Sequence, residues 1–289
     1  MRKKRKHQKG VRAMVGILLV LWTVFGVIGL FTVAQRVFGM ENKSEVEADT
    51  RESQEQRTVP EIIGSFEETA GSTEENPKLE LTEEEQAECK EIYENHPELL
   101  VLVNKEHELD ESYDPKLRTI CNGRLEASDR MYQDLTKMLH AAGDAGYEYW
   151  IASAYRSRQR QQQLIDEDVE TLMQKGWNYE EALEQTLQQT MPAGYSEHET
   201  GLALDILCSG NMSMDDSQAN EPGNQWLVEH CSEYGFILRY PKDKETVTGI
   251  DCEPWHFRYV GRDAAVFMME HDLTLEDFFN IYRNDTLPS

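Results

Sequence analysis

The stretch from Ser196 to Asp205 combines a histidine, a glycine and an aspartate in residue types that suit metal chemistry. Asp205 lies within a run of small and apolar residues, 201–207, which is typical of a strand that enters a core. A carboxylate in such a run is costly to bury unless a positive group meets it. A metal ion would supply that charge, and His198 would be a second ligand.

A second stretch, Glu253–Gly261, contains another histidine, His256. Zinc in hydrolases takes three protein ligands from His, Asp and Glu and leaves one position for water. His198, Asp205 and His256 match that set. A metal in such a site polarises the substrate carbonyl and lowers the pKa of the water, and a carboxylate must pass the water's proton to the leaving amine. Glu253 is the predicted base.

The strand expected for this second stretch raises a geometric difficulty. In a flat strand, Glu253 and His256 point to opposite faces. Pro254 lies between them, lacks an N–H and fixes its own φ, so we expect the regular strand to begin after it. A bend at Pro254 would bring Glu253 round to the metal.

A third stretch, Ser153–Ser157, places Arg156 at the end of an aromatic and β-branched segment. An arginine there would hold a carboxylate or a developing oxyanion through its planar fork. Each signal is weak alone, because most lone histidines in strands are packed core residues and most lone arginines are solvated charges. We expect Glu197 and Glu199, in a polar loop, to be solvated. The predicted site depends on the three stretches occurring together.

The rest of the pattern predicts an α+β domain, because strands and helices are mixed without regular β-α alternation. Thr82 followed by three glutamates resembles a capped helix start, and Thr274 with Asp277 resembles another. The predicted helices span 83–95, 128–142, two segments of 157–190 separated near Gly176, 226–231 and a last one from Thr274; the predicted strands span 99–103, 147–155, 201–207, 235–240 and 255–260.

The N-terminal residues differ from the rest of the chain. Residues 1–13 form a basic tail, and the run from Met14 to Ala34 is 21 residues long without a charge. As a helix, this run would span roughly 30 Å, the thickness of a bilayer core, and its basic flank predicts a cytoplasmic N-terminus. We expect a single-pass membrane anchor with the catalytic domain outside the cytoplasm. Cleavage as a signal peptide after Ala34 is the alternative.

The amino-acid composition after residue 34 limits which partners the protein can bind. Residues 35–81 are acidic and poor in large apolar side chains, which predicts a flexible stalk, and 82–289 form the predicted catalytic domain. Residues 1–40 carry eight of the 29 basic residues and no acid, so the remainder holds 21 basic and 54 acidic residues, a formal charge of −33. Nucleic acid is therefore not an expected partner, because phosphate binding needs Lys and Arg. Five scattered cysteines without CxxC spacing argue against a thiolate zinc site and leave their pairing open.

The sequences SEHETGLALDI (196–206), EPWHFRYVG (253–261) and SAYRS (153–157) together resemble those of the VanY-type D-alanyl-D-alanine carboxypeptidases, which are zinc peptidases. The similarity extends from about residue 96 to 283. It implies an α+β domain related in fold to the hedgehog signalling domain, with a small, mostly antiparallel sheet and flanking helices around one zinc ion. Cys252 departs from the pattern, since many relatives carry an aromatic residue at this position.

The resemblance also carries over to individual residues. It implies zinc ligands His198, Asp205 and His256, a catalytic base Glu253, an Arg156 that steadies the substrate carbonyl or carboxylate, and Gln161 and Ser196 in contact with the terminal substrate residues.

The expected protein is thus a membrane-anchored zinc D,D-carboxypeptidase that removes the terminal D-Ala from peptidoglycan stem peptides. One alternative is an L,D-carboxypeptidase that trims tetrapeptide stems, because relatives with nearly the same motifs do this. Another is a non-catalytic cell-wall-binding module of the same fold.

Overall fold

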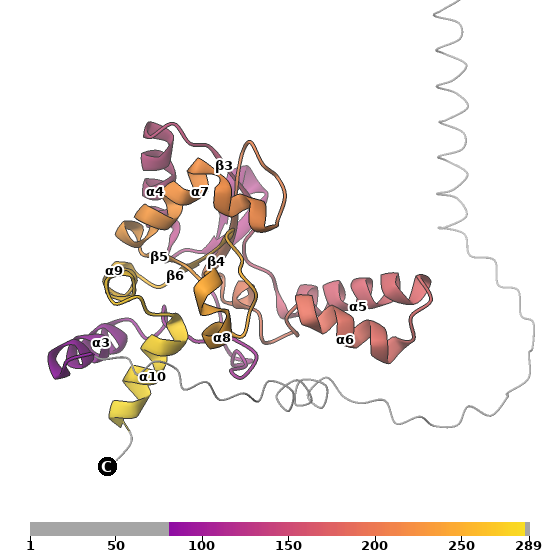
Figure 1. The fold of residues 1–289 in the computed structure, drawn as a ribbon, viewed down its shortest axis with the longest axis horizontal. Coiled ribbons are helices and arrows are strands. Elements are labelled where there is room, and N and C mark those ends of the chain that lie inside the picture. The colour runs from indigo at the N-terminus through magenta and orange to yellow at the C-terminus, as the bar shows by residue number, and fades with distance from the viewer. Residues whose placement is uncertain (1–80, 287–289) are drawn as a thin grey trace, which may run out of the picture. The chain divides into compact units, whose positions relative to one another are not determined.

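The computed structural model describes residues 81–286 (Figure 1). The predicted basic tail, the predicted anchor and all but the last residue of the predicted stalk lie outside the described residues. Among the described residues, the helices are all too short or too polar to cross a membrane.

A four-stranded antiparallel sheet lies at the centre of the domain (Figure 1). Its strands are hydrogen-bonded in the order β3 (Tyr149–Ser153), β4 (Ala203–Cys208), β6 (His256–Tyr259) and β5 (Phe236–Leu238). Every residue of β4 and β6 is buried, as the apolar runs in the sequence suggest. The predicted α+β class with an antiparallel sheet is confirmed.

A second, two-stranded sheet pairs β1 (Leu117–Ile120) with β2 (Leu125–Ser128). This hairpin was not among the predicted elements. Its turn contains Asn122 and Gly123, with φ values of 55° and 90°. Asn-Gly is a frequent hairpin turn because both residues tolerate positive φ, so the signal was present in the sequence.

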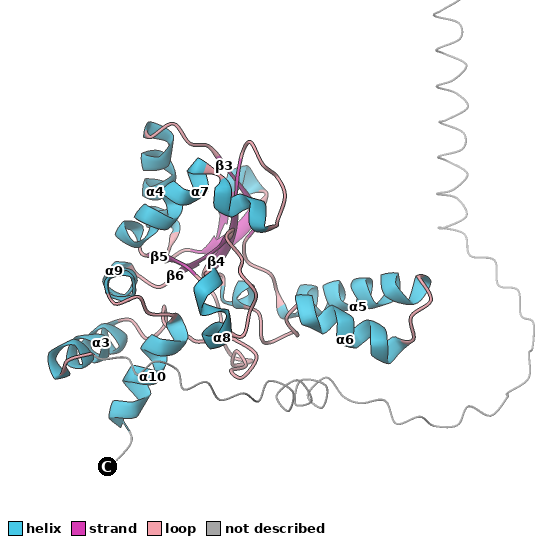
Figure 2. Cartoon of the chain, viewed as in Figure 1, coloured by secondary structure: helices cyan, strands magenta, loops and turns pink. Residues whose placement is uncertain are grey.

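Helices pack around the central sheet, and the α5–α6 pair extends away from it (Figure 2). The predicted capping box at the first of them is present, since Thr82 and Glu85 satisfy each other's backbone N–H groups. Helix α9 was not predicted. The helices are α3 (Glu83–Asn95), α4 (Tyr132–Asp144), α5 (Arg158–Gln174), α6 (Tyr179–Gln189), α7 (Pro222–His230), α8 (Glu245–Thr248), α9 (Arg262–Glu270) and α10 (Leu275–Thr286), with 3-10 turns at Cys121–Gly123, Glu197–Thr200, Asp216–Asn220, Cys231–Tyr234 and Lys242–Lys244.

The two faces of the central sheet have different roles. Leu204 and Phe257 lie opposite each other on β4 and β6 and belong to one apolar cluster with residues of α4 and α7. Side chains alternate between the faces of a strand. The next pair along these strands, Asp205 and His256, therefore points to the other face.

Two further apolar clusters complete the core. One joins α3, α9 and α10 and contains Phe267 and Phe278. The other, which contains Ile165, Val169 and Leu183, lies between α5 and α6, which run side by side as a hairpin (Figure 1). The break between these two helices falls near Gly176, as predicted.

The predicted strand at 99–103 is wrong. These residues are largely buried, but they belong to neither sheet. The guanidinium of Arg258 donates hydrogen bonds to the carbonyls of Leu99 and Val101, at 3.1 and 2.9 Å. A side chain thus takes the place of a neighbouring strand as the partner of this segment.

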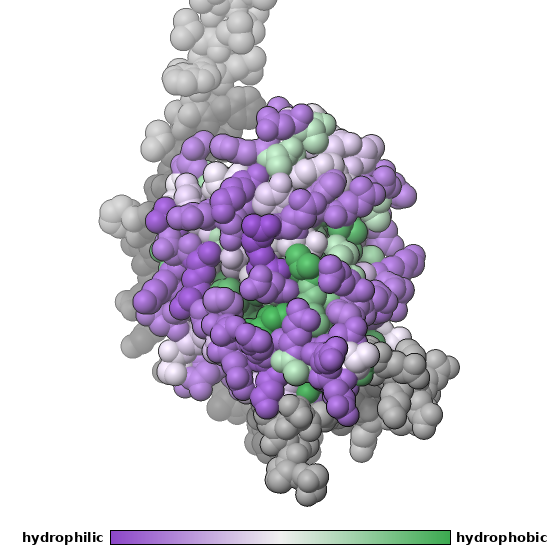
Figure 3. Space-filling model, turned by 90° about the vertical axis from the view of Figure 1, so that its left-hand side faces the viewer, coloured by the Kyte–Doolittle hydropathy of each residue, from purple (hydrophilic) through white to green (hydrophobic). Residues whose placement is uncertain are grey.

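One face of the domain is mainly polar. Hydrophilic residues cover most of the face seen in Figure 3, and apolar residues form small, separate areas. The larger exposed apolar side chains include Met173, Trp177 and Tyr179, around the turn between α5 and α6. This surface agrees with the acidic composition of the chain.

Candidate metal centre and active site

The register of the central sheet brings two of the predicted ligands together. Asp205 on β4 is the direct partner of His256 on β6, and Ser153 on β3 is its partner on the other side. Directly opposed residues point to the same face with their Cβ atoms roughly 5 Å apart. Asp205 Oδ1 accordingly lies 3.3 Å from His256 Nδ1.

A short turn before β4 supplies the third predicted ligand. His198 lies in the 3-10 turn Glu197–Thr200, which ends at Gly201 with a φ of 70°. A side chain on Gly201 would be strained by this φ and would approach the backbone nitrogen of Ser128 to 3.3 Å. The turn directs His198 Nε2 to within 3.3 Å of Asp205 Oδ2.

The three side chains form a buried cluster suited to a divalent metal. One ligand atom from each of His198, Asp205 and His256 lies within 4.8 Å of the others. The second ring nitrogen of each histidine has its own partner: His198 Nδ1 lies 2.8 Å from the carbonyl of Ala154, and His256 Nε2 lies 3.4 Å from Glu197 Oε2. Such contacts fix the tautomer and leave the other nitrogen free to bind a metal.

Asp205 supplies an independent sign that a cation fits here. Its carboxylate is buried, and within residues 81–286 its Oδ1 has no hydrogen-bond partner. Burial alone would raise the pKa of Asp205, but His198 and His256 outweigh it and hold that pKa below its ordinary value. An ionised, under-satisfied carboxylate beside two imidazoles is a donor set that zinc-type metals bind.

The predicted base, Glu253, lies beside this cluster. Its Oε2 is 3.3 Å from His256 Nδ1, and its side chain is 29% exposed. The expected bend at Pro254 is present, because the His256 N–H donates to the Glu253 carbonyl at 3.0 Å and β6 begins only at His256. Asn224 holds the bend by donating to the carbonyl of Pro254 at 2.6 Å.

Arg156 reaches the same region from the segment after β3. Its guanidinium donates to Gln161 Oε1 at 2.8 Å and to Ser153 Oγ at 3.1 Å, and its backbone N–H donates to the carbonyl of His198. Burial lowers the pKa of Arg156, and the nearby carboxylate of Asp205 partly offsets this. The amide of Gln161 also donates to the carbonyl of Met191, so in this structure Gln161 orients Arg156.

The residues next to His198 differ from the predicted solvated loop. Glu197 and Glu199, expected to be solvated, are both buried, with 3% and 4% of their surface exposed. Glu197 accepts hydrogen bonds from Arg239, directly after β5, and from Arg258 in β6. An arginine within or next to a short buried strand was a signal in the sequence that a buried acid is its partner. Ser196 is buried at the start of the turn, and its contact with substrate stays a prediction.

Comparison with known proteins places this site in a family. A model of the VanY D-alanyl-D-alanine carboxypeptidases matches residues 124–262. The D-alanyl-D-alanine carboxypeptidase of Enterococcus faecalis is 35% identical over 184 residues, which are 63% of this chain and 65% of that relative. A structure of the D,D-pentapeptidase VanY from a VanB-type vancomycin-resistance cassette, in complex with Zn(II), is 35% identical, with a TM-score of 0.55 over 63% of this chain and 99% of that one. The chain belongs to the VanY family.

The VanY match includes every predicted site residue, from Arg156 to His256. Membership of this family makes the chain a metallo-carboxypeptidase, which is a hydrolase. It argues against the alternative of a non-catalytic wall-binding module. A further structure of the same fold is the LdcB LD-carboxypeptidase, 32% identical, with a TM-score of 0.55 over 64% of this chain and 87% of that one. Solved structures similar to this chain are thus named for both D,D- and LD-carboxypeptidase activities.

Substitution of the central carboxylate tests the metal centre. Asp205→Asn keeps the side-chain shape but removes the negative charge, so we expect the purified protein to lose nearly all of its bound metal. His230→Gln is the control, because His230 lies at the end of α7, is partly exposed and pairs with Glu233. Elemental analysis of both variants and the unaltered protein measures this. Full metal content in Asp205→Asn would contradict the assignment.

Proposed function

We propose that this VanY-family protein is a zinc-dependent D,D-carboxypeptidase that removes the terminal D-Ala from peptidoglycan stem peptides. The observation that carries the proposal is the convergence of His198 Nε2, the Asp205 carboxylate and His256 Nδ1 beside Glu253. Catalytic zinc takes three such nitrogen and oxygen ligands and keeps one position open. The Zn(II) in the related VanY structure supports the choice of metal.

The reaction needs a base within reach of the metal position. A zinc ion held there supplies a Lewis acid that polarises the scissile carbonyl and lowers the pKa of a water molecule. Glu253 takes the proton of the attacking water at its Oε2, which already faces His256 Nδ1. The same carboxyl then delivers that proton to the amino group of the departing D-Ala. Its partial exposure leaves room for water and substrate to approach.

Arg156 supplies the positive group that a peptide terminus needs. Its guanidinium is half-buried and held by Ser153 and Gln161, so little freedom remains to be lost when substrate binds. A planar fork of this kind binds a carboxylate through two parallel hydrogen bonds. Arg156 therefore holds the terminal carboxylate or the carbonyl oxygen of the substrate, and Gln161 and Ser196 are the proposed contacts of the terminal substrate residues.

Removal of the base separates chemistry from metal binding. Glu253→Ala removes the group that moves the proton and leaves the three ligands in place. We expect zinc to be retained and the turnover number to fall by roughly 10²–10⁴-fold. Glu270→Ala, at the end of α9, is the control and keeps full turnover. Retained turnover in Glu253→Ala would remove Glu253 from the mechanism.

The stem-peptide specificity is testable with two substrates. The family description and the E. faecalis relative favour a pentapeptide ending in D-Ala-D-Ala, whereas the likeness to LdcB keeps the L,D activity on tetrapeptides as the second candidate. Incubation of the zinc-loaded protein with each stem peptide, followed by mass analysis, separates them. We expect loss of one alanine from the pentapeptide and no further trimming. Cleavage of the tetrapeptide alone would establish the L,D activity instead.

We also propose that the apolar run from Met14 to Ala34 anchors the enzyme, with the catalytic domain at the outer face of the membrane. The support is the length of the run and its basic N-terminal flank. In fractionated bacteria we expect the full chain in the carbonate-washed membrane pellet and a variant without residues 1–34 in the soluble fraction. If the full-length gene instead yields a soluble product that begins after Ala34, signal-peptide cleavage is favoured.

A further inference from the structure

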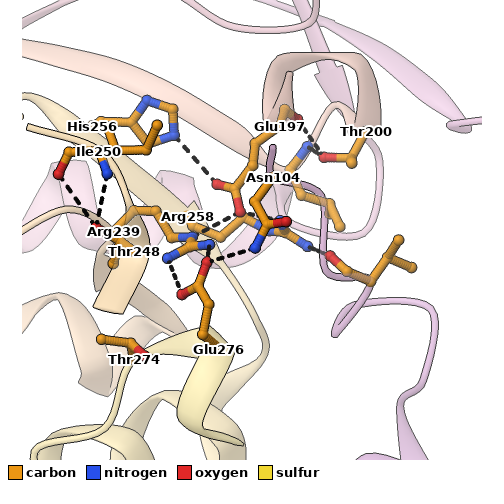
Figure 4. A network of polar contacts seen from close by, with 12 residues as sticks. Asn104, Glu197, Thr200, Arg239, Thr248, Ile250, His256, Arg258, Thr274 and Glu276 are labelled. Carbon is orange, nitrogen blue, oxygen red and sulfur yellow. Dashed lines mark hydrogen bonds and ion pairs between the residues drawn. The ribbon is translucent and has the colours of Figure 1, made fainter. Parts of the chain in front are cut away.

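Behind the predicted metal ligand His256 lies a buried network of charged side chains (Figure 4). Glu197 is at its centre. Its Oε1 accepts hydrogen bonds from Arg239 Nε at 2.8 Å and Arg258 Nη1 at 2.9 Å, and both arginines are essentially inaccessible to solvent. Its other oxygen, Oε2, faces His256 Nε2 at 3.4 Å. One carboxylate therefore joins two buried arginines to a histidine of the metal centre.

The network continues from Arg239 to the C-terminal helix. Arg239 Nη1 and Nη2 donate to the two oxygens of Glu276 at 2.7 and 2.6 Å, a bidentate pair. Asn104 adds a third hydrogen bond to Glu276 at 3.1 Å. Glu276 belongs to the first turn of α10. A continuous path of direct contacts thus leads from α10 through Arg239 and Glu197 to His256.

The charges in this network balance. Two glutamates face two arginines, so the buried group is formally neutral. Burial would raise the pKa of Glu197, but Arg239 and Arg258 hold it well below its ordinary value. Removing one member of such a buried network leaves an uncompensated charge, which is far more costly than losing a surface ion pair.

The orientation of the His256 ring indicates what Glu197 does at the metal centre. Nδ1 faces the metal position beside Asp205 and Glu253, and Nε2 faces Glu197. With a metal bound at Nδ1, the ring hydrogen is on Nε2, where it can be donated to Glu197. A carboxylate behind a metal-binding imidazole fixes its tautomer and ring orientation and makes the ligand more basic. Loss of such a partner typically costs about 10- to 100-fold in metal affinity.

We propose that Glu197 is a positioning residue for His256, and that Arg239 and Glu276 extend this support to α10, so that the C-terminal helix helps to set the affinity of the site for zinc. This inference rests on the proposed zinc site. The competing explanation is that the network only attaches α10 to the sheet, in which case its loss would lower stability and leave metal affinity unchanged.

Two neighbouring residues of α10 separate these explanations. Glu276 contacts Arg239, whereas Asp277 caps the helix by accepting hydrogen bonds from the backbone N–H and hydroxyl of Thr274. Glu276→Gln removes a negative charge from the first turn of α10, and Asp277→Asn weakens the capping box with Thr274, so both variants weaken the start of the helix. Only Glu276→Gln breaks the path to His256.

The test measures the zinc dissociation constant by competition with a chromophoric chelator, together with the Tm of the zinc-free protein and the visible spectrum of the Co(II)-substituted protein. We expect Glu197→Gln to weaken zinc binding by about 10- to 100-fold and to alter the Co(II) spectrum. Glu276→Gln should shift both readouts in the same direction by a smaller amount. Asp277→Asn should lower the Tm and leave zinc affinity and the spectrum unchanged.

Equal zinc affinity in Glu276→Gln and Asp277→Asn at a similar Tm would overturn the link to α10. Unchanged affinity in Glu197→Gln would overturn the role of Glu197 itself. If Glu197→Gln does not fold, the comparison between Glu276→Gln and Asp277→Asn still decides the link. Failure of the unaltered protein to bind zinc would instead refute the proposed zinc site, and is recognised before any variant is measured.

Discussion

The structure depends on the register between β4 and β6, which sets Asp205 opposite His256. A slip of one residue would turn every side chain of a strand to the other face. It would bring Asp205 into the apolar cluster and direct Leu204 into the metal centre. The apolar pair Leu204 and Phe257 on the opposite face therefore fixes the position of the polar pair. The same strand register therefore determines both the packing of the core and the geometry of the site.

The turn that carries His198 is held from both sides by the acids that flank it. Glu197 points toward Arg239 and Arg258, whereas Glu199 accepts the Gly194 N–H at 2.7 Å and lies 3.5 Å from Arg158 at the start of α5. The first contact connects His198 to the sheet and α10, and the second connects it to the α5–α6 hairpin. A metal site built this way gains its rigidity from residues that never touch the metal.

Much of the site could be predicted from the sequence because its polar residues are costly to bury in apolar segments unless they bind a partner. An aspartate in a small, apolar strand and a proline between Glu253 and His256 led to the observed cluster and bend. The burial of Glu197 was missed, because its partners Arg239 and Arg258 lie more than forty residues away and only the folded sheet brings them close. The 99–103 segment was misjudged for the same reason: its carbonyl partner is a side chain, and strand patterns do not reveal that.

The central claim is that His198, Asp205 and His256 bind one zinc ion. X-ray absorption at the zinc edge of the metal-loaded protein tests it most directly. We predict two nitrogen ligands at about 2.0–2.1 Å, a carboxylate oxygen at about 2.0–2.2 Å and one further oxygen from water. Replacement of His198 by glutamine should remove one imidazole from the shell. A sulfur ligand at about 2.3 Å, or a shell without imidazole, would contradict the account.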